Sequence, residues 1–428
     1  MLETIECELA IIGAGMSGMA ATFFASERGI RTVQVGTSGS LSFASGLFDL
    51  LGVHPIEEKN RQTDPWIGIK ALYHDLPGHP YVKTGEATLK TSFSELISFL
   101  ESAGISYCHE ENRNSEVLTS LGTTKPSYYV PQSMWWGVDA YQKKTPCLLV
   151  GFRGMKEFSS RQLETVLKEK WKDLRSVTMD FPGAENYLEV YPERLARSLD
   201  AGQTGKILAE LIKKQVKDAK IIGLPAMLGV HKNREIMREM EEIIGIPIFE
   251  IPTLPVSVPG LRLKEAFENH LSNKGVRQLH SKKVLKGARV PGKGFELDIG
   301  AIEPEVRIKA AGVILASGRF LGGGLVADRT KVSETIFNLP VKQIAKRDQW
   351  HRYTFFDNQG HLLNQTGLDV DESFRPINEE GKQVHEDLFA TGAILAHHDW
   401  MRMKCGSGVS VATAYAAVQA FIENSSQN

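Results

Sequence analysis

The chain contains 428 residues, of which 42% are hydrophobic and 24% are charged, and its formal net charge is −1 at pH 7. A chain of this length exceeds one hydrophobic core and predicts two domains or one domain with a large insertion. The near-neutral charge argues against a nucleic-acid-binding protein, and no apolar run reaches the roughly 18 residues of a transmembrane helix.

The four cysteines lie far apart, at positions 7, 108, 147 and 405, and form no Cys-x-x-Cys pair. This spacing favours a reducing, cytoplasmic location. It also lacks the local cysteine runs that hold iron–sulfur clusters, so we expect no cluster on this chain. The N-terminus carries Glu3, Glu6 and Glu8 and no basic region, so no signal peptide is expected.

The first 36 residues predict a nucleotide-binding strand–turn–helix unit. Leu9–Ile12 reads as a buried strand, Met19–Phe24 as a helix and Val33–Val35 as the next parallel strand. Between them lies Gly13-Ala14-Gly15-Met16-Ser17-Gly18, in which the first glycine permits a sharp turn, the second lets the backbone approach a phosphate, and the third allows close helix–strand packing. The start of the helix then offers N–H groups and a positive dipole end to that phosphate.

One position departs from the usual dinucleotide pattern. A dinucleotide site normally has Asp or Glu at the end of the second strand, where it holds the adenosine ribose. The residue here is Gly36, and no carboxylate lies between Glu27 and Asp49. The sequence therefore favours a flavin mononucleotide, or a dinucleotide held differently.

The middle of the chain divides into regions of different composition. Residues 37–55 form a Gly/Ser loop and an apolar segment, and 56–145 are mixed and rich in Pro, Tyr and Trp, which predicts an irregular cap. From 146 to 251, apolar strands alternate with amphipathic helices, which predicts an inserted parallel α/β module.

The last region, 252–428, predicts the remainder of the first domain. An amphipathic helix over Leu261–Ser272 is followed by strands up to Ile308, and a buried strand leads into Ala316-Ser317-Gly318. Leu388-Phe-Ala-Thr-Gly repeats that design, and Gly406-Ser407-Gly408 opens a final Ala-rich helix whose N-terminus offers another anion site.

The N-terminal glycine pattern, the central Val-Ile-Leu-Ala-Ser-Gly and the C-terminal Leu-Phe-Ala-Thr-Gly resemble flavoproteins of the glutathione-reductase fold, in which three remote segments meet at one flavin. The resemblance implies an α/β fold: a Rossmann-like flavin-binding domain with inserted α/β and cap regions, divided as 1–55, 56–145, 146–251 and 252–428. The implied flavin-contacting residues are Gly13, Ala14, Gly15, Ser17, Gly18, Ser45, Gly46, Ser317, Gly318, Gly392, Gly406, Ser407 and Gly408.

Four longer segments are more specific. Phe43-Ala-Ser-Gly-Leu-Phe-Asp-Leu-Leu, Leu254-Pro-Val-Ser-Val-Pro-Gly-Leu-Arg-Leu, Ser317-Gly-Arg-Phe-Leu-Gly-Gly-Gly-Leu-Val-Ala-Asp-Arg and Asp371-Glu-Ser-Phe-Arg-Pro resemble the B-subunit family of anaerobic glycerol-3-phosphate dehydrogenase. That family implies oxidation of sn-glycerol 3-phosphate to dihydroxyacetone phosphate, FMN as the cofactor with FAD as the alternative, and a catalytic A subunit in an A/B dimer. It also implies an iron–sulfur C subunit that anchors the dimer to the inner membrane and passes electrons to quinone in fumarate or nitrate respiration.

Oxidation of an alcohol by flavin needs a base for the hydroxyl proton, and a substrate phosphate favours arginine. His397 and His398 are the candidate general bases, with Asp399 beside them. The two histidines lack the spaced partner ligands of a metal site. Candidate phosphate ligands within the family-like segments are Arg319, Arg329 and Arg375, and Arg262 lies in another of these segments.

Two features weaken the family pattern. Many flavoproteins of this fold have an acid directly after the C-terminal Thr-Gly, to hold the ribityl chain, and Ala393 stands there in this chain. Asp371 and Asp399 are the nearby alternatives. Together with Gly36, this leaves two other readings open: a non-catalytic structural subunit of the same complex, and a free-standing flavin oxidoreductase of another substrate.

Overall fold

The computed structural model describes residues 2–426, which form two compact units. The first contains the chain up to Leu41, Asp49–Ser98, and the chain from Phe267 onward. The second contains Ser42–Phe48 and Phe99–Ala266. The unit boundaries differ from the predicted ones, because the expected cap at 56–145 is divided between the units at residue 98 and the short segment 42–48 joins the second unit.

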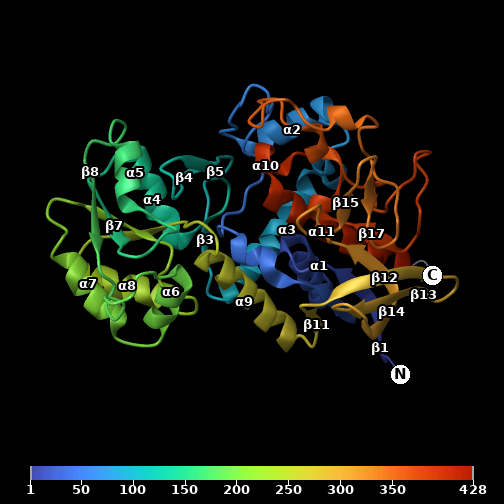
Figure 1. The fold of residues 1–428 in the computed structure, drawn as a ribbon, viewed down its shortest axis with the longest axis horizontal. Coiled ribbons are helices and arrows are strands. Elements are labelled where there is room, and N and C mark those ends of the chain that lie inside the picture. The colour runs from blue at the N-terminus through green and yellow to red at the C-terminus, as the bar shows by residue number, and fades with distance from the viewer. Residues whose placement is uncertain (1, 427–428) are drawn as a thin grey trace. The chain divides into compact units, whose positions relative to one another are not determined.

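Within the described residues, the first unit is built on a seven-stranded sheet in the order β11-β2-β1-β14-β13-β12, with β17 paired to β14 (Figure 1). β1 pairs in parallel with β2 and β14, and β14 pairs in parallel with β17, whereas β12, β13 and β14 are antiparallel. The strands are β1 Glu3–Ile12, β2 Thr32–Gly36, β11 Arg277–His280, β12 Lys283–Val290, β13 Gly294–Gly300, β14 Pro304–Leu315 and β17 Leu388–Ala390.

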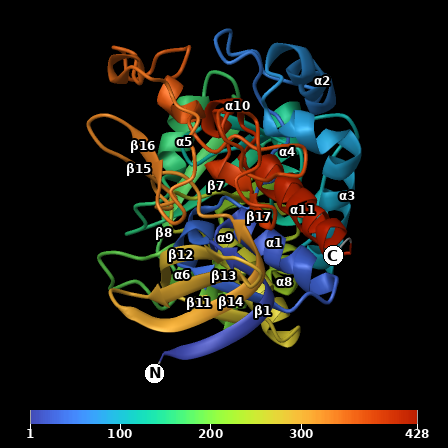
Figure 2. The same ribbon diagram turned by 90° about the vertical axis from the view of Figure 1, so that its right-hand side faces the viewer.

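Two buried helices lie side by side in this unit, α1 (Met16–Glu27) and α11 (Gly406–Ser425), as Figure 2 shows. Small residues on both helices permit this close packing, and the Phe24 and Tyr415 rings meet edge to face at 5.1 Å between centroids. The predicted N-terminal strand, helix and second strand are confirmed, each longer than predicted because the apolar pattern marks only the buried part of an element. The final helix is confirmed as well.

The region predicted as an irregular cap is largely helical. It contains α2 (Pro65–Asp75), α3 (Pro80–Ser102) and α4 (Gln132–Lys143). The Asp64 side chain accepts a hydrogen bond from the backbone N–H of Trp66 and caps α2, which has proline in its first turn. Two of the prolines in this region, Pro65 and Pro80, are therefore the first residues of helices.

The first unit also contains short elements, which are β15 Leu325–Ala327, β16 Val332–Glu334, the 3₁₀ turns Arg347–Gln349, Leu362–Gln365 and Gly392–Ile394, and α10 Trp400–Met403. A further 3₁₀ turn, Ser38–Phe43, lies at the boundary of the two units. No helix among the residues described here has both the length and the apolar character needed to cross a membrane.

The second unit holds the parallel sheet predicted for 146–251. Within residues 2–426 it has four strands in the order β10-β9-β7-β8, packed around a core that includes Trp171 and Phe249. The four strands are β7 Cys147–Phe152, β8 Leu174–Met179, β9 Ile221–Pro225 and β10 Ile248–Ile251. The other elements of the unit are β3 Tyr107–Cys108, β4 Ser115–Leu118, β5 Thr124–Ser127, β6 Val130–Pro131, α5 Ser160–Leu167, α6 Pro192–Asp200, α7 Thr204–Lys213 and α8 Asn233–Ile244. The helix α9 (Val258–Asn273) begins three residues earlier than predicted.

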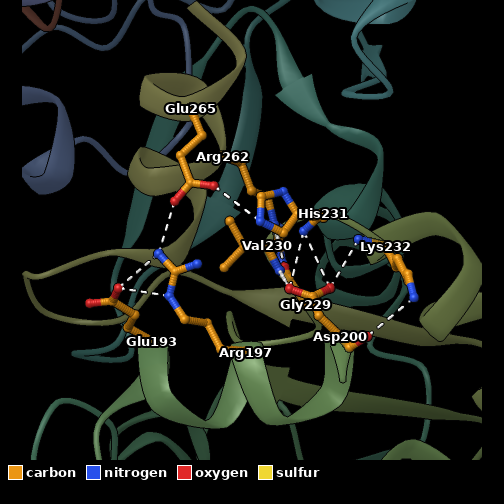
Figure 3. Close-up of polar contacts among 9 residues, drawn as sticks. All are labelled: Glu193, Arg197, Asp200, Gly229, Val230, His231, Lys232, Arg262 and Glu265. Carbon is orange, nitrogen blue, oxygen red and sulfur yellow. Dashed lines mark hydrogen bonds and ion pairs between the residues drawn. The ribbon is translucent and has the colours of Figure 1, made fainter. Parts of the chain in front are cut away.

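A polar network ties α6, the start of α8 and α9 together in the second unit (Figure 3). The Asp200 carboxylate accepts hydrogen bonds from the backbone N–H groups of Val230, His231 and Lys232. Arg197 pairs with Glu193 at 3.0 Å and with Glu265 at 2.9 Å, both measured from Nη2 to Oε1. This network accounts for charged residues that the sequence left without a role.

Candidate functional site

The segments predicted to meet at a flavin follow the carboxyl ends of β1, β2, β14 and β17, which are parallel neighbours. Gly13 has a φ of 130°, and a Cβ there would overlap the carbonyl oxygen of Ala316. A Cβ on Gly18 would overlap the carbonyl oxygen of Gly13. The turn and the close packing predicted for these two glycines are confirmed.

Gly15 has a different environment from the other two glycines. It is the N-cap of α1, and the nearest atom to a Cβ built there is Ser40 Oγ, at 3.0 Å. No side chain caps this helix start in the described structure. The first-turn N–H groups of α1, which include that of Ser17, therefore have no carbonyl partner within the helix and face the space next to Gly15 and Ala14.

A chain of buried hydroxyl groups joins the first segment to the last two. Ser17 Oγ lies 2.8 Å from Thr391 Oγ1, which lies 2.7 Å from Thr413 Oγ1 on α11. Thr413 Oγ1 also accepts a hydrogen bond from the backbone N–H of Gly392, whose own Cβ position would be filled by Ser17. Gly392 has a φ of 76°. This chain holds three segments together that are remote in sequence.

The end of β2 has no room for a side chain. A Cβ on Gly36 would lie 2.7 Å from the backbone nitrogen of Ala14 and 2.9 Å from the carbonyl carbon of Gly13. A ribose-binding carboxylate at this position would displace the glycine turn itself. The packing of the turn therefore requires glycine at position 36, which explains why no acid stands there.

The start of α11 is held by other parts of the first unit. Ser407 Oγ accepts a hydrogen bond of 2.6 Å from the backbone N–H of Asp49, and the Gly408 N–H donates to the Asp49 carbonyl at 2.9 Å. A Cβ on Gly408 would overlap the Tyr81 hydroxyl, and one on Gly406 would lie 2.9 Å from the Trp400 ring. The Gly408 N–H, one of the groups predicted to bind an anion, therefore bonds to a protein carbonyl instead.

The central segment makes a tight turn. Gly318 has a φ of 69°, and a Cβ on Gly322 or Gly324 would overlap the carbonyl oxygens of Ser317 or Gly318. The glycine-rich loop therefore packs back on residues 317–318.

Ser45 and Gly46 belong to the second unit. A Cβ on Gly46 would lie 2.8 Å from Pro259 Cβ, and the Gly46 carbonyl accepts a hydrogen bond of 2.7 Å from the Tyr107 hydroxyl. The contacts of Gly46 within its own unit therefore account for the glycine.

The arginines predicted to hold a phosphate are placed differently from one another. Arg375 Nε pairs with Asp371 at 2.7 Å, and Arg329 is exposed. Arg262 is buried and pairs with Glu250 in the second unit. The buried Arg319 donates from Nη1 to the Asn364 carbonyl and from Nη2 to the carbonyls of Leu395 (2.7 Å) and His398 (2.9 Å). Burial lowers the pKa of Arg319 to about 10, so it stays charged at neutral pH.

His398 is fully buried and has one nitrogen without a partner. Nδ1 lies 3.1 Å from the Ala396 carbonyl, which can only accept, and 3.3 Å from Arg319 Nη2. Because Arg319 Nη2 already donates its two hydrogens to the carbonyls of Leu395 and His398, Nδ1 carries the proton toward Ala396 and Nε2 keeps a lone pair. Nε2 makes no hydrogen bond in the described structure. Burial, with the Arg319 charge, lowers the pKa of His398 well below its ordinary value, so its imidazole is neutral.

His79 lies against His398, with ring centroids 5.8 Å apart. The backbone N–H of Tyr81 donates to His79 Nδ1 at 3.1 Å, which puts the His79 proton on Nε2, 4.0 Å from Cys405 Sγ. Burial lowers the pKa of His79 to about 3 and raises that of the Cys405 thiol, so both are uncharged. Sequence reasoning missed His79, because a single histidine between Gly78 and Pro80 carries no motif.

His397 is half-buried, has a φ of 67° and pairs through Nε2 with Asp369 Oδ2 at 3.4 Å. With Asp399 it lines a cavity of about 220 Å³ that also contains His54, Asp75 and Glu57. Among the described residues that line this cavity there is no Lys or Arg, which makes it unsuited to a phosphate dianion. The Asp399 carboxylate accepts hydrogen bonds from Asn364 and Arg402, so, like Asp371, it serves local structure.

Of the eight buried side-chain polar atoms that lack a partner among the described residues, three bear on whether these segments fit a cofactor: Ser317 Oγ, Arg319 Nε and His398 Nε2. Buried polar groups are normally satisfied, and an orphaned one indicates a missing ligand or water. All three belong to segments predicted to line the flavin or its substrate, and the Arg319 and His398 side chains lie 3.3 Å apart. Donors and acceptors of this kind suit the polar edge of a flavin ring, so the residues fit the group.

Comparisons with known proteins agree with this geometry. The FAD binding domain family matches residues 8–409. The B subunit of a probable anaerobic glycerol-3-phosphate dehydrogenase from Halobacterium salinarum strain R1 is 30% identical to this chain and covers 98% of each protein. The anaerobic glycerol-3-phosphate dehydrogenase B subunit of Vibrio cholerae strain N16961 is 26% identical over 98% of this chain and 97% of that protein. That of Yersinia pestis strain Antiqua is 28% identical over 98% of each. The chain therefore belongs to the FAD binding domain family and, within it, to the B-subunit family of anaerobic glycerol-3-phosphate dehydrogenase.

Proposed function

We propose that this chain is the flavin-carrying B subunit of a respiratory enzyme that oxidises sn-glycerol 3-phosphate to dihydroxyacetone phosphate. In this proposal it forms an A/B dimer with a catalytic A subunit. An iron–sulfur C subunit holds the dimer at the inner membrane on the cytoplasmic side and passes the electrons to quinone, for fumarate or nitrate respiration. The family assignment supports the reaction, and the naming of the relatives as B subunits supports the complex.

The observation that carries the proposal is the group of buried, unpartnered polar atoms at Ser317, Arg319 and His398, on the segments that follow β14 and β17. A flavin bound there supplies the two-electron acceptor that alcohol oxidation requires. Ser17 and the first turn of α1 offer N–H groups to its phosphate, and Ser317 Oγ and Arg319 Nε are available as hydrogen-bond partners. His398 Nε2, neutral and unpaired, is the atom that takes the hydroxyl proton of the substrate.

For the cofactor we propose FMN. Gly36 leaves no space for the carboxylate that holds an adenosine ribose, so the adenosine half of a dinucleotide lacks its usual partner here. The family model is described as an FAD binding domain and supports FAD as the alternative. Extraction of the flavin and chromatography against both standards separates the two, with FAD as the result that overturns this choice.

A second candidate role is electron relay, with substrate oxidation in the catalytic partner. The arginines favour it: Arg319 and Arg375 are committed to protein acceptors, and Arg329 is exposed. The nearby cavity is lined by carboxylates. A substrate phosphate would then be held by the partner.

Anaerobic bleaching of the flavin absorbance tests both roles. The purified chain is mixed with sn-glycerol 3-phosphate, alone and after addition of the catalytic partner. Bleaching of the chain alone supports substrate oxidation by this chain, and bleaching that requires the catalytic partner supports relay. A chain that retains no flavin after gentle purification with its partners contradicts both and leaves a purely structural role.

A further inference from the structure

The first unit exposes a group of aromatic side chains on one loop. In residues 350–361, here called the aromatic loop, Tyr353, Phe355 and Phe356 are each at least 76% exposed. The Phe355 and Phe356 rings contact each other edge to face, with 4.9 Å between centroids. Three adjacent aromatic side chains in water are costly, because each leaves a large apolar area unburied. Such a patch indicates a surface that is covered in the working protein.

The aromatic loop contains no helix or strand, but hydrogen bonds fix parts of its backbone. Trp350 is buried and donates through Nε1 to the Ile344 carbonyl at 2.9 Å. His361 Nδ1 accepts from the Arg352 N–H at 3.1 Å, and its Nε2 lies 3.0 Å from the Phe355 carbonyl. A single neutral tautomer, protonated on Nε2, satisfies both bonds. The His361 ring therefore bridges the backbone of Arg352 and Phe355, which limits the conformations of the segment between them and preorganises its aromatic side chains for contact.

The loop is connected to the candidate flavin site. The position of a Cβ on Gly360 lies 3.2 Å from Arg402 Cδ and 3.3 Å from Asp399 Oδ2. Asn364 then accepts from Arg319 through its carbonyl and donates through its amide to Asp399. Trp400 and Met401, on α10 beside Arg402, are themselves 37% and 53% exposed. A protein seated on this surface would lie next to the segments that hold His398.

We infer that the aromatic loop with Trp400 and Met401 is the docking surface for an electron-transferring protein partner, which presents an apolar recess with an acidic rim. Aromatic residues, Met and Arg are the types enriched at protein interfaces. Within residues 346–361 the charged residues are Lys346, Arg347 and Arg352 against Asp348 and Asp357, an excess of one positive charge, so the complementary rim is acidic.

The inference rests on the proposed function, whose complex supplies the partner. A protein fits better than a lipid surface, because membrane-surface binding of this type normally uses an amphipathic helix, and residues 350–361 form none.

The test uses the tagged chain co-expressed with the catalytic and iron–sulfur partners of the proposed enzyme. The variant carries Tyr353→Ser, Phe355→Ser and Phe356→Ser together, and the matched control carries Ile302→Ser, which removes a 90% exposed apolar side chain elsewhere in the same unit. Biolayer interferometry measures the affinity for the purified iron–sulfur partner, the electron-transferring protein of the proposed complex. We expect the triple variant to bind at least about 30-fold more weakly, the loss of one interface hot spot or more, with flavin content unchanged. The control should bind like the wild type.

Other results decide against the docking surface. Unchanged affinity of the triple variant overturns it. So does binding of the wild-type chain to vesicles of anionic phospholipid that the triple variant loses while its affinity for the protein partners stays unchanged. A third variant, Arg352→Glu, should slow association and reduce its dependence on salt. If the wild type carries no flavin but the triple variant still loses its partner, the docking surface stands and the proposed function fails.

Discussion

Ser17 Oγ and Thr391 Oγ1 lie 2.8 Å apart although 374 residues separate them in the chain. Thr391 also contacts the Thr413 hydroxyl, so the pair links α1, the end of β17 and α11. The three hydroxyls are buried; Thr413 also donates to the Val409 carbonyl at 2.6 Å, whereas the Ser17 hydroxyl bonds to Thr391.

We expect Thr391→Val to lower the free energy of unfolding by about 1–3 kcal/mol, because it keeps the volume and leaves a buried hydroxyl unpaired. Urea denaturation followed by circular dichroism measures the change. Ser17→Ala combined with Thr391→Val should cost less than the sum of the two single variants. Strictly additive costs would show that the two hydroxyls do not interact.

Gly15 and Gly18 should respond oppositely to a side chain. Gly15→Val places its side chain in the space next to the α1 N-terminus, where the phosphate is proposed to bind, and the nearest existing atom is an exposed serine hydroxyl. We expect loss of flavin absorbance with a normal circular dichroism spectrum. Gly18→Ala should instead destabilise the fold, because the new Cβ overlaps the Gly13 carbonyl. Flavin retained by Gly15→Val would place the phosphate elsewhere.

His398 and His397 provide a matched pair for the proton-transfer role. A general base contributes about 10²–10⁴-fold to rate, so His398→Ala in the complex should lower the rate of substrate-driven flavin reduction by about 100-fold or more. His397→Ala should have a small effect, because that ring pairs with Asp369. Rapid mixing under anaerobic conditions gives both rates. Equal rates for His398→Ala and the wild type would remove His398 from the mechanism.

Arg262 is predicted to support stability. Nη1 donates to Glu250 Oε2 at 2.7 Å and Nη2 to Glu250 Oε1 at 2.9 Å, and both residues are buried. Burial, the largest single effect, raises the Glu250 pKa, but the Arg262 charge and the hydrogen bonds from Arg262 and the Leu228 N–H together outweigh it and hold the pKa below its ordinary value.

Arg262→Met leaves the buried Glu250 carboxylate without its counter-charge and should lower the free energy of unfolding by about 3–5 kcal/mol. Adding Glu250→Gln should recover part of the loss, as measured by thermal unfolding. A loss of activity without a loss of stability would instead favour a binding role.

Acid should destabilise the first unit through its buried histidines. His79 has a pKa of about 3 when folded and about 6.5 when unfolded, so the unfolded chain binds more protons between these values and stability falls as pH falls below 6.5. Each such histidine contributes about 1.4 kcal/mol per pH unit.

His79→Gln keeps an acceptor for the Tyr81 N–H and removes the titration. The slope of unfolding free energy against pH between 6 and 4 should become shallower by about one proton. An unchanged slope would show that His79 is protonated in the folded protein.

The sequence by itself determined the local structure around the glycine turn and the parallel strands. Gly13 is required by the positive φ of the turn and Gly18 by its contact with the Gly13 carbonyl, both within one strand–turn–helix unit, and a buried strand is recognised from its own apolar run. The family-like segments at Ser317 and Asp371 also identified the family from residues alone.

Only the tertiary structure decided which remote side chains meet. It showed that Arg262 pairs with Glu250, that His79 lies against His398, and that the Ser17 hydroxyl reaches Thr391. It also turned a region expected to be irregular into helices that begin at prolines. A local sequence pattern reports how a residue fits its own helix or strand. The partner of a buried charge or hydroxyl is set by how sheet and helices pack, which no single stretch of sequence contains.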